Sequence, residues 1–111
     1  GKTTLQLLFV EETFSRNAYP KPGQVVGMLH DLAQEKEGIK NIVSIGVLSD
    51  LITIRATEES GFEVHGFISY LNKNAPQAFP EGGGHQHAGA IRFVPSQREL
   101  ILKSLRSFIT K

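Results

Sequence analysis

The sequence has no cysteine, no long apolar run and no large excess of charge of one sign. The absence of cysteine excludes a disulfide framework, a thiolate metal site and thiol catalysis. Apolar runs such as Leu7–Val10 are far shorter than the roughly 18 residues that a membrane span needs, and we expect no signal peptide. We therefore expect an aqueous setting, with the cytoplasm as the compartment, and no membrane partner.

The charge is balanced, because 12 Lys and Arg residues face 11 Asp and Glu residues, for a net charge of +1. This balance argues against the broad basic face that holds duplex DNA by counterion release, although local basic pockets are compatible with it. With 111 residues, 40% of them apolar, the chain is long enough to bury a core without disulfides or a structural zinc.

The chain also lacks an initiator methionine and begins Gly1-Lys2-Thr3-Thr4, directly before an apolar segment. We expect residues 1–111 to be a single domain cut from a longer protein. The four residues imitate the end of a phosphate-binding loop, but the strand and the first glycine of that motif are missing.

Hydrophobic periodicity predicts strands alternating with helices. The expected strands are Leu5–Val10, Ile42–Leu48, Leu51–Thr57 and Ile91–Val94. We expect one helix over Gln24–Glu37, after a loop at Ser15–Gly23, and two more that begin at the capping boxes Ser60–Glu63 and Ser96–Glu99. This order predicts an α/β (α+β) fold, a two-layer sandwich of a small mixed sheet with about three helices.

Three adjacent glycines, Gly82–Gly84, followed by His85, form the least ordinary feature of the sequence. Successive glycine amides can line a concave anion site, and a histidine beside them can donate to the same anion, for which phosphate is the natural guest. The same run is also typical of a flexible connector, and spacing alone leaves both interpretations open. The small residues Ala88, Gly89 and Ala90 that follow suggest close approach of a ligand or another backbone.

The run Gly82-Gly83-Gly84-His85, followed by Ala88 and a further glycine, resembles the C-terminal substrate-binding domain associated with DHH-type phosphoesterases. This superfamily includes RecJ-type exonucleases, nano-RNases and exopolyphosphatase-related proteins. The resemblance extends from about Ile42 to the C-terminus and includes an arginine, Arg55, on a strand before the second helix. In one respect the sequence departs from the family, since Gly89 stands one position early and Ala90 occupies the expected glycine site.

The resemblance implies a phosphate site made of Gly82, Gly83, Gly84, His85 and Arg55, with His87, Phe79, Ala88 and Gly89 as further candidates for contacts to the nucleotide. Short single-stranded nucleic acid or a small nucleotide would be the ligand. Without the resemblance, Arg55 is better explained as a surface strand residue that pairs with Glu58 or Glu59, and with it the two explanations are equally good. Phe79 can stack on a base, but a packed side chain explains it better.

The Asp-His-His triplet and the aspartate-rich motif of the superfamily do not occur in this sequence. We therefore expect no metal site and no hydrolysis by this chain alone. The resemblance implies a manganese centre in a separate N-terminal catalytic domain of the same protein, which would be a phosphoesterase such as an exonuclease. His85 and His87 would share one face if both lay on a strand, but no further metal ligand except Glu81 is near in sequence.

Other interpretations stay open at this point. The domain is also compatible with a non-catalytic nucleic-acid-binding or assembly module, like the similar domain of alanyl-tRNA synthetases. A third hypothesis is a homodimer, in which Leu5–Val10 pairs edge to edge with a second copy. His30, in the middle of the first helix beside Asp31, is expected to face solvent.

Overall fold

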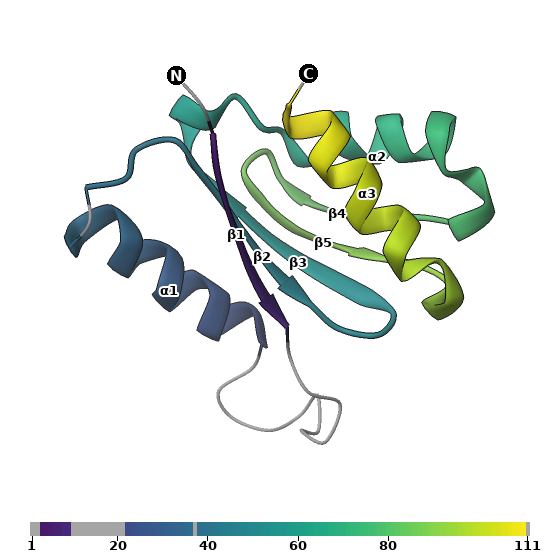
Figure 1. The fold of residues 1–111 in the computed structure, drawn as a ribbon, viewed down its shortest axis with the longest axis horizontal. Helices are drawn as coiled ribbons and strands as arrows, with labels where there is room; N and C mark the ends of the chain where they lie inside the picture. The colour runs from purple at the N-terminus through teal and green to yellow at the C-terminus, as the bar shows by residue number, and fades with distance from the viewer. Residues whose placement is uncertain (1–2, 10–21, 37, 111) are drawn as a thin grey trace.

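The chain folds around one five-stranded sheet in the order β1-β2-β3-β5-β4. The computed structural model describes residues 3–9, 22–36 and 38–110 (Figure 1). The strands are β1 (Thr4–Phe9), β2 (Ile42–Val47), β3 (Leu51–Ala56), β4 (Glu81–His85) and β5 (Ala88–Arg92). The helices are α1 (Pro22–Lys36), α2 (Val64–Asn74) and α3 (Arg98–Ile109). Since β1 runs parallel to β2 and the other pairs are antiparallel, the sheet is mixed, as predicted.

The helices divide between the two faces of the sheet. α2 and α3 lie over one face, and α1 lies over β2 and β3 on the other (Figure 1). The predicted α/β fold with three helices is confirmed, and the position of α1 adds a layer to the expected two-layer arrangement. Because α1 does not extend over β5 and β4, no helix of the described residues covers these two strands on the face of the sheet that carries α1.

The main hydrophobic core lies between the sheet and the pair α2 and α3. β-Branched residues that alternate along β2, β3 and β5 face this side, and four aromatic rings close it. The rings of Phe62, Phe67 and Phe108 meet at centroid distances of 5.3–5.6 Å, and Tyr70 packs on Phe108 at 5.2 Å. Each large side chain buried here contributes roughly 1.5–3 kcal/mol, so the stability of the domain resides mainly on this side.

The two predicted capping boxes are not formed. α2 begins at Val64 after Glu63, and α3 begins at Arg98 after Gln97, without a side-chain cap in either case. Ser60 instead ends a short 3₁₀ turn, where its hydroxyl donates to the carbonyl of Thr57 and accepts the amide of Phe62. Ser96 is exposed within a second such turn. The pattern marked the approach to each helix correctly, but each serine lies in a 3₁₀ turn, and α2 and α3 begin only at Val64 and Arg98.

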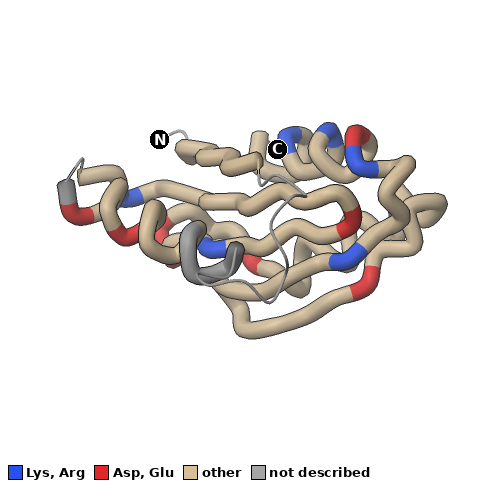
Figure 2. The backbone as a smooth tube through the Cα atoms, turned by 90° about the horizontal axis from the view of Figure 1, so that it is seen from below, with Lys and Arg blue, Asp and Glu red and all other residues tan. Residues whose placement is uncertain are grey.

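The start of α1 and the glycine segment also differ from prediction. Pro22 and Gly23 belong to α1 rather than to the expected loop, whose remaining residues lie outside the described part of the chain. Gly82–Gly84 form the edge strand β4 instead of a loop. Among the described residues, no helix is both long enough and apolar enough to cross a membrane. Charges of both signs are interspersed along the fold (Figure 2).

Candidate functional site

A cross-strand row of side chains places the two most specific candidates together. The register pairs Gln6 with Ser44, Ser44 with Arg55, Arg55 with Ala88, and Ala88 with His85. Directly paired residues point to the same face of a sheet, so this row crosses all five strands on the face that carries α1. Arg55 and His85 stand two strands apart, which is roughly 10 Å at the backbone, with only the methyl group of Ala88 between them.

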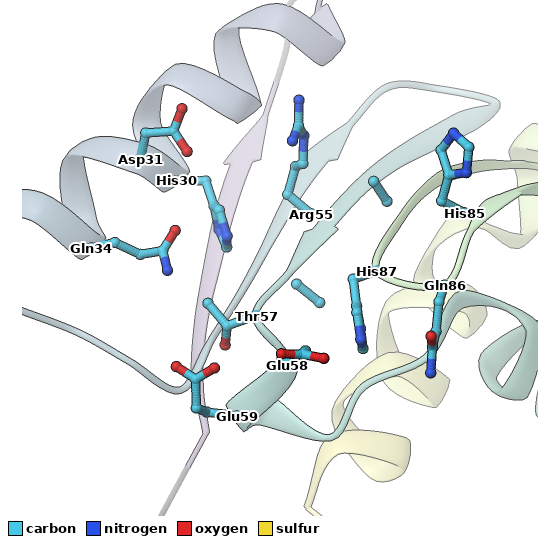
Figure 3. A pocket seen from close by; sticks show the side chains of 12 residues that line it. His30, Asp31, Gln34, Arg55, Thr57, Glu58, Glu59, His85, Gln86 and His87 are labelled. Carbon is cyan, nitrogen blue, oxygen red and sulfur yellow. The ribbon is translucent and has the colours of Figure 1, made fainter.

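The next row on this face is made of small residues. It runs through Gly46, Thr53, Ala90 and Gly83. An open hollow of about 450 Å³ lies along the first row, the one that contains Arg55 and His85 (Figure 3). It is lined by His30, Asp31, Gln34, Arg55, Ala56, Thr57, Glu58, Glu59, His85, Gln86, His87 and Ala88. A second hollow of about 440 Å³ shares Arg55, His85 and Ala88 with the first and extends over Thr53 and Ala90. The uncovered part of the sheet therefore forms one continuous open surface with a cation at its centre.

Arg55 is exposed, as its place on the strand predicted, and it faces away from the apolar core. Among the described residues it forms no ion pair, so it does not neutralise Glu58 or Glu59, although both line the same hollow. Its guanidinium lies instead beside Gly27 of α1, where a Cβ would come within 3.2 Å of Arg55 Nη2. A cation without an acidic partner keeps its donors available for an anionic ligand.

The three glycines of β4 have two different roles. A Cβ on Gly82 would collide with the backbone of Ala90, and a Cβ on Gly84 would lie 2.5 Å from the carbonyl oxygen of Ala88. Gly84 also has a φ of 136°, which favours glycine. A Cβ on Gly83 would meet nothing within 4 Å. Gly82 and Gly84 are thus required for close pairing with β5, whereas Gly83 leaves the open face unobstructed.

Hydrogen bonds to β3 and to the start of α2 fix the turn between β4 and β5. The carbonyl of Gln86 accepts the amide of Val64, and the carbonyl of His87 accepts the amide of Ala56. The side chain of Gln86 donates to Glu63, and His87 Nδ1 lies 2.9 Å from the carbonyl oxygen of Phe62. Because a carbonyl can only accept, His87 Nδ1 carries a proton in this contact. These bonds fix the edge of the hollow in place.

The remaining candidates from the sequence lie at different distances from the hollow. Ala88 and His87 line it. Gly89 borders the second hollow, but a Cβ there would point to α2, 3.1 Å from Val64 Cγ1. Phe79 is 74% exposed at a φ of 50°, neither packed nor among the residues that line the two hollows.

The expectation for His30 was wrong. Its side chain is only 5% exposed, because α1 packs on the sheet through Val26, His30 and Ala33 and turns Leu32 toward solvent. His30 Nδ1 lies 2.8 Å from the hydroxyl of Ser44, and this hydroxyl donates to Gln6 Oε1 at 3.0 Å. Burial lowers the pKa of His30 below its ordinary value, so the ring is neutral near pH 7. The contact between His30 and Ser44 could not be predicted from a histidine beside an aspartate in a helix, because it depends on which residues of β2 face α1.

The side chains that line this surface do not form a metal centre. His85 ends β4 and His87 lies beyond the turn, so they do not share a strand face. Within residues 3–9, 22–36 and 38–110, no group of three or more His, Asp or Glu side chains is arranged to hold a metal ion. The described residues therefore hold no such group of ligands.

Comparisons with known proteins identify relatives of this domain. No protein-family model matches the chain. An uncharacterized protein of Methanocaldococcus jannaschii, MJ1198, is 31% identical over 103 residues, which is 88% of this chain and 14% of that protein. A solved structure described as the DHH domain of a member of the s1p family of ribosomal proteins superposes with a TM-score of 0.86 at 28% identity, over 96% of this chain and 25% of that one. Both relatives are much longer than the chain.

Proposed function

We propose that this chain, a DHH-associated domain, binds the phosphate of a nucleotide or of a short single-stranded nucleic acid on the open face between Arg55 and His85. The observation that carries the proposal is the shared row of Arg55, Ala88 and His85, which sets two potential donors on either side of a floor without bulk. Arginine binds phosphate through paired N–H donors, and histidine adds a third contact.

Gly83 and Ala90 continue this floor and leave room for further parts of the ligand, such as a base. The site has one central cation rather than a basic stripe, so it suits a single phosphate group or chain end better than a duplex. The fixed turn at Gln86 and His87 supports this proposal, because a site held before binding loses less entropy when the ligand arrives.

We further propose that the domain is the C-terminal part of a longer phosphoesterase, whose other domain holds the manganese centre. The motif Gly82–His85 and the DHH description of the structural relative support this. In such an enzyme the present domain would bind and orient the substrate, while the metal ions, when bound in the other domain, would activate water.

The test is a titration of the 111-residue chain with the 5′-phosphorylated dinucleotide pApA, followed by calorimetry and by amide shifts in an NMR spectrum. We expect shifts at Gly83, His85 and Ala88, and Arg55→Ala should weaken binding at least tenfold. The matched control is Arg92→Ala, since Arg92 is exposed on the same face but does not line either hollow. Equal affinity of the Arg55→Ala and Arg92→Ala variants would refute the site.

A further inference from the structure

The hollow contains a buried histidine that the proposed phosphate site does not use. His30 enters from α1 and lines the hollow with Arg55 and Thr57 (Figure 3). Its Nδ1 is engaged by Ser44, and its Nε2 has no hydrogen-bond partner among the described residues. Thr53 Oγ1 is the only fully enclosed side-chain oxygen or nitrogen of these residues without a partner. His30 Nε2 is therefore not sealed off but reachable from the hollow.

The hydrogen-bond chain behind His30 determines which ring nitrogen carries the proton. The hydroxyl of Ser44 donates its only proton to Gln6 Oε1, so it must accept a proton from His30 Nδ1. A neutral imidazole has a single N–H, and here Nδ1 holds it. His30 Nε2 consequently presents a lone pair to the hollow and acts as an acceptor.

The distance between His30 and Arg55 limits what can lie between them. The guanidinium of Arg55 rests against Gly27, which precedes His30 by three residues on the same helix. Side chains three residues apart on a helix have Cβ atoms roughly 5–6 Å from each other. His30 Nε2 is therefore within reach of the sugar of a ligand whose phosphate is bound by Arg55.

We propose that His30 Nε2 accepts a hydrogen bond from a hydroxyl of this sugar and so makes the site selective for ribonucleotides. This inference rests on the proposed function. A fully ionised phosphate group has no proton to donate to the lone pair, so the group opposite His30 must be another donor, and a sugar hydroxyl is the donor nearest to a phosphate. The 2′-hydroxyl is also the group by which proteins distinguish RNA from DNA.

The first test is binding of the 111-residue chain to adenosine 5′-monophosphate and to its 2′-deoxy and 3′-deoxy forms. We expect one deoxy form to bind roughly threefold to tenfold more weakly, the usual net contribution of one hydrogen bond. Inosine 5′-monophosphate, which lacks the exocyclic amine, should bind as well as the adenosine nucleotide. Equal affinity for the ribose and both deoxy forms, or a loss that follows the amine instead, overturns the proposal.

The matched variants are His30→Asn and His30→Gln. The amide of asparagine can keep the bond to Ser44 at the place of Nδ1 but has no atom at the place of Nε2, whereas glutamine restores an acceptor there. We expect His30→Asn to bind ribose and deoxyribose forms equally and His30→Gln to keep part of the preference. A wild-type preference in a folded His30→Asn variant would contradict the role of Nε2.

Ser44 acts through His30 and has its own readout. Nitrogen-15 spectra of the histidines should show Nδ1 protonated in the wild-type chain, and Ser44→Ala should remove this preference together with the discrimination between the sugars. An Nε2-protonated His30 in the wild-type chain would overturn the inference. If inorganic phosphate and all the nucleotides fail to bind, the proposed function itself fails. If phosphate binds and the sugars are not distinguished, only the role of His30 is lost.

Discussion

The three glycines of β4 affect stability and binding in different ways. Gly82→Ala and Gly84→Ala would force a methyl group into the backbone of β5, and such overpacking costs about 1–3 kcal/mol. Gly83→Val meets no neighbour and adds a residue that favours strands, so the free energy of unfolding should stay the same or rise. Its side chain would stand on the open face beside Ala90, and affinity for pApA should fall. Urea unfolding and calorimetry measure the two effects. A loss of stability in Gly83→Val equal to that in Gly82→Ala would contradict this division of roles.

Gly27 is a further residue at which a single methyl group should affect binding. A Cβ at position 27 would make a tight contact with the tip of the Arg55 side chain, 3.2 Å from Nη2. Gly27→Ala removes a glycine from a helix interior, which is worth roughly 1 kcal/mol of stability, and the flexible guanidinium can move aside at little cost. We expect an equal or higher melting temperature together with several-fold weaker phosphate binding. A variant with unchanged affinity would show that the guanidinium is not held in place by α1.

Among the elements, those whose sequence carries a local signal were predictable and those formed by long-range pairing were not. β2 and β3 are rich in β-branched residues, and the first and last residues of both strands were predicted to within one residue. β4 was missed, because glycine has little intrinsic preference for strands and its pairing depends on β5, which a single window of sequence does not reveal. Arg55 and His85 were candidates from the family resemblance, but that they lie in one row follows only from the register of the strands.

The face through which α1 packs on the sheet could not be predicted from the sequence of the helix alone. Val25, Val26, Leu29, Leu32 and Ala33 gave a helical stripe, yet the helix packs through Val26, His30 and Ala33. The surface below it is not apolar but consists of Ser44, Gly46 and Thr53, so a histidine with a hydrogen-bond partner fits there. A Cβ on Gly46 would come within 2.5 Å of Val26 Cγ2. The face of the sheet thus selects the face of the helix.

The 3₁₀ turns before α2 and α3 give different expectations for the two serines. Ser60 makes two hydrogen bonds of 2.6 and 3.2 Å, so Ser60→Ala should lower the free energy of unfolding by about 1 kcal/mol. Ser96 is exposed in its turn and makes no side-chain cap, so Ser96→Ala should change stability by less than about 0.5 kcal/mol. Urea unfolding of both variants checks this. Equal losses would indicate that Ser96 caps α3 in solution.

At the scale of the whole molecule, the sheet separates stability from recognition. The face under α2 and α3 is filled by apolar side chains and aromatic rings, whereas the opposite face is only partly covered by α1. Residues on the open side can therefore be exchanged without loss of the core. His30 is the exception, since it is buried, titratable and connected to both α1 and the sheet.

The pH dependence of unfolding should reveal this connection. Burial lowers the pKa of His30 from 6.5, the Asp31 carboxylate opposes this effect, and Arg55 adds to it. The unfolded chain therefore binds a proton at a higher pH than the folded one, so the neutral ring contributes stability that is complete above about pH 6.5 and is lost as the pH falls below this value. Urea unfolding of the wild-type chain between about pH 5 and 8 should show this decline toward acid. His30→Asn has no titrating group at this position, so its free energy of unfolding should depend less on pH. Parallel pH profiles of the wild-type chain and His30→Asn would mean that His30 is hydrated in the folded state. Phosphate bound at Arg55 would offset the cation that helps to lower the pKa of His30, so its presence should make the decline shallower in the wild-type chain and not in Arg55→Ala.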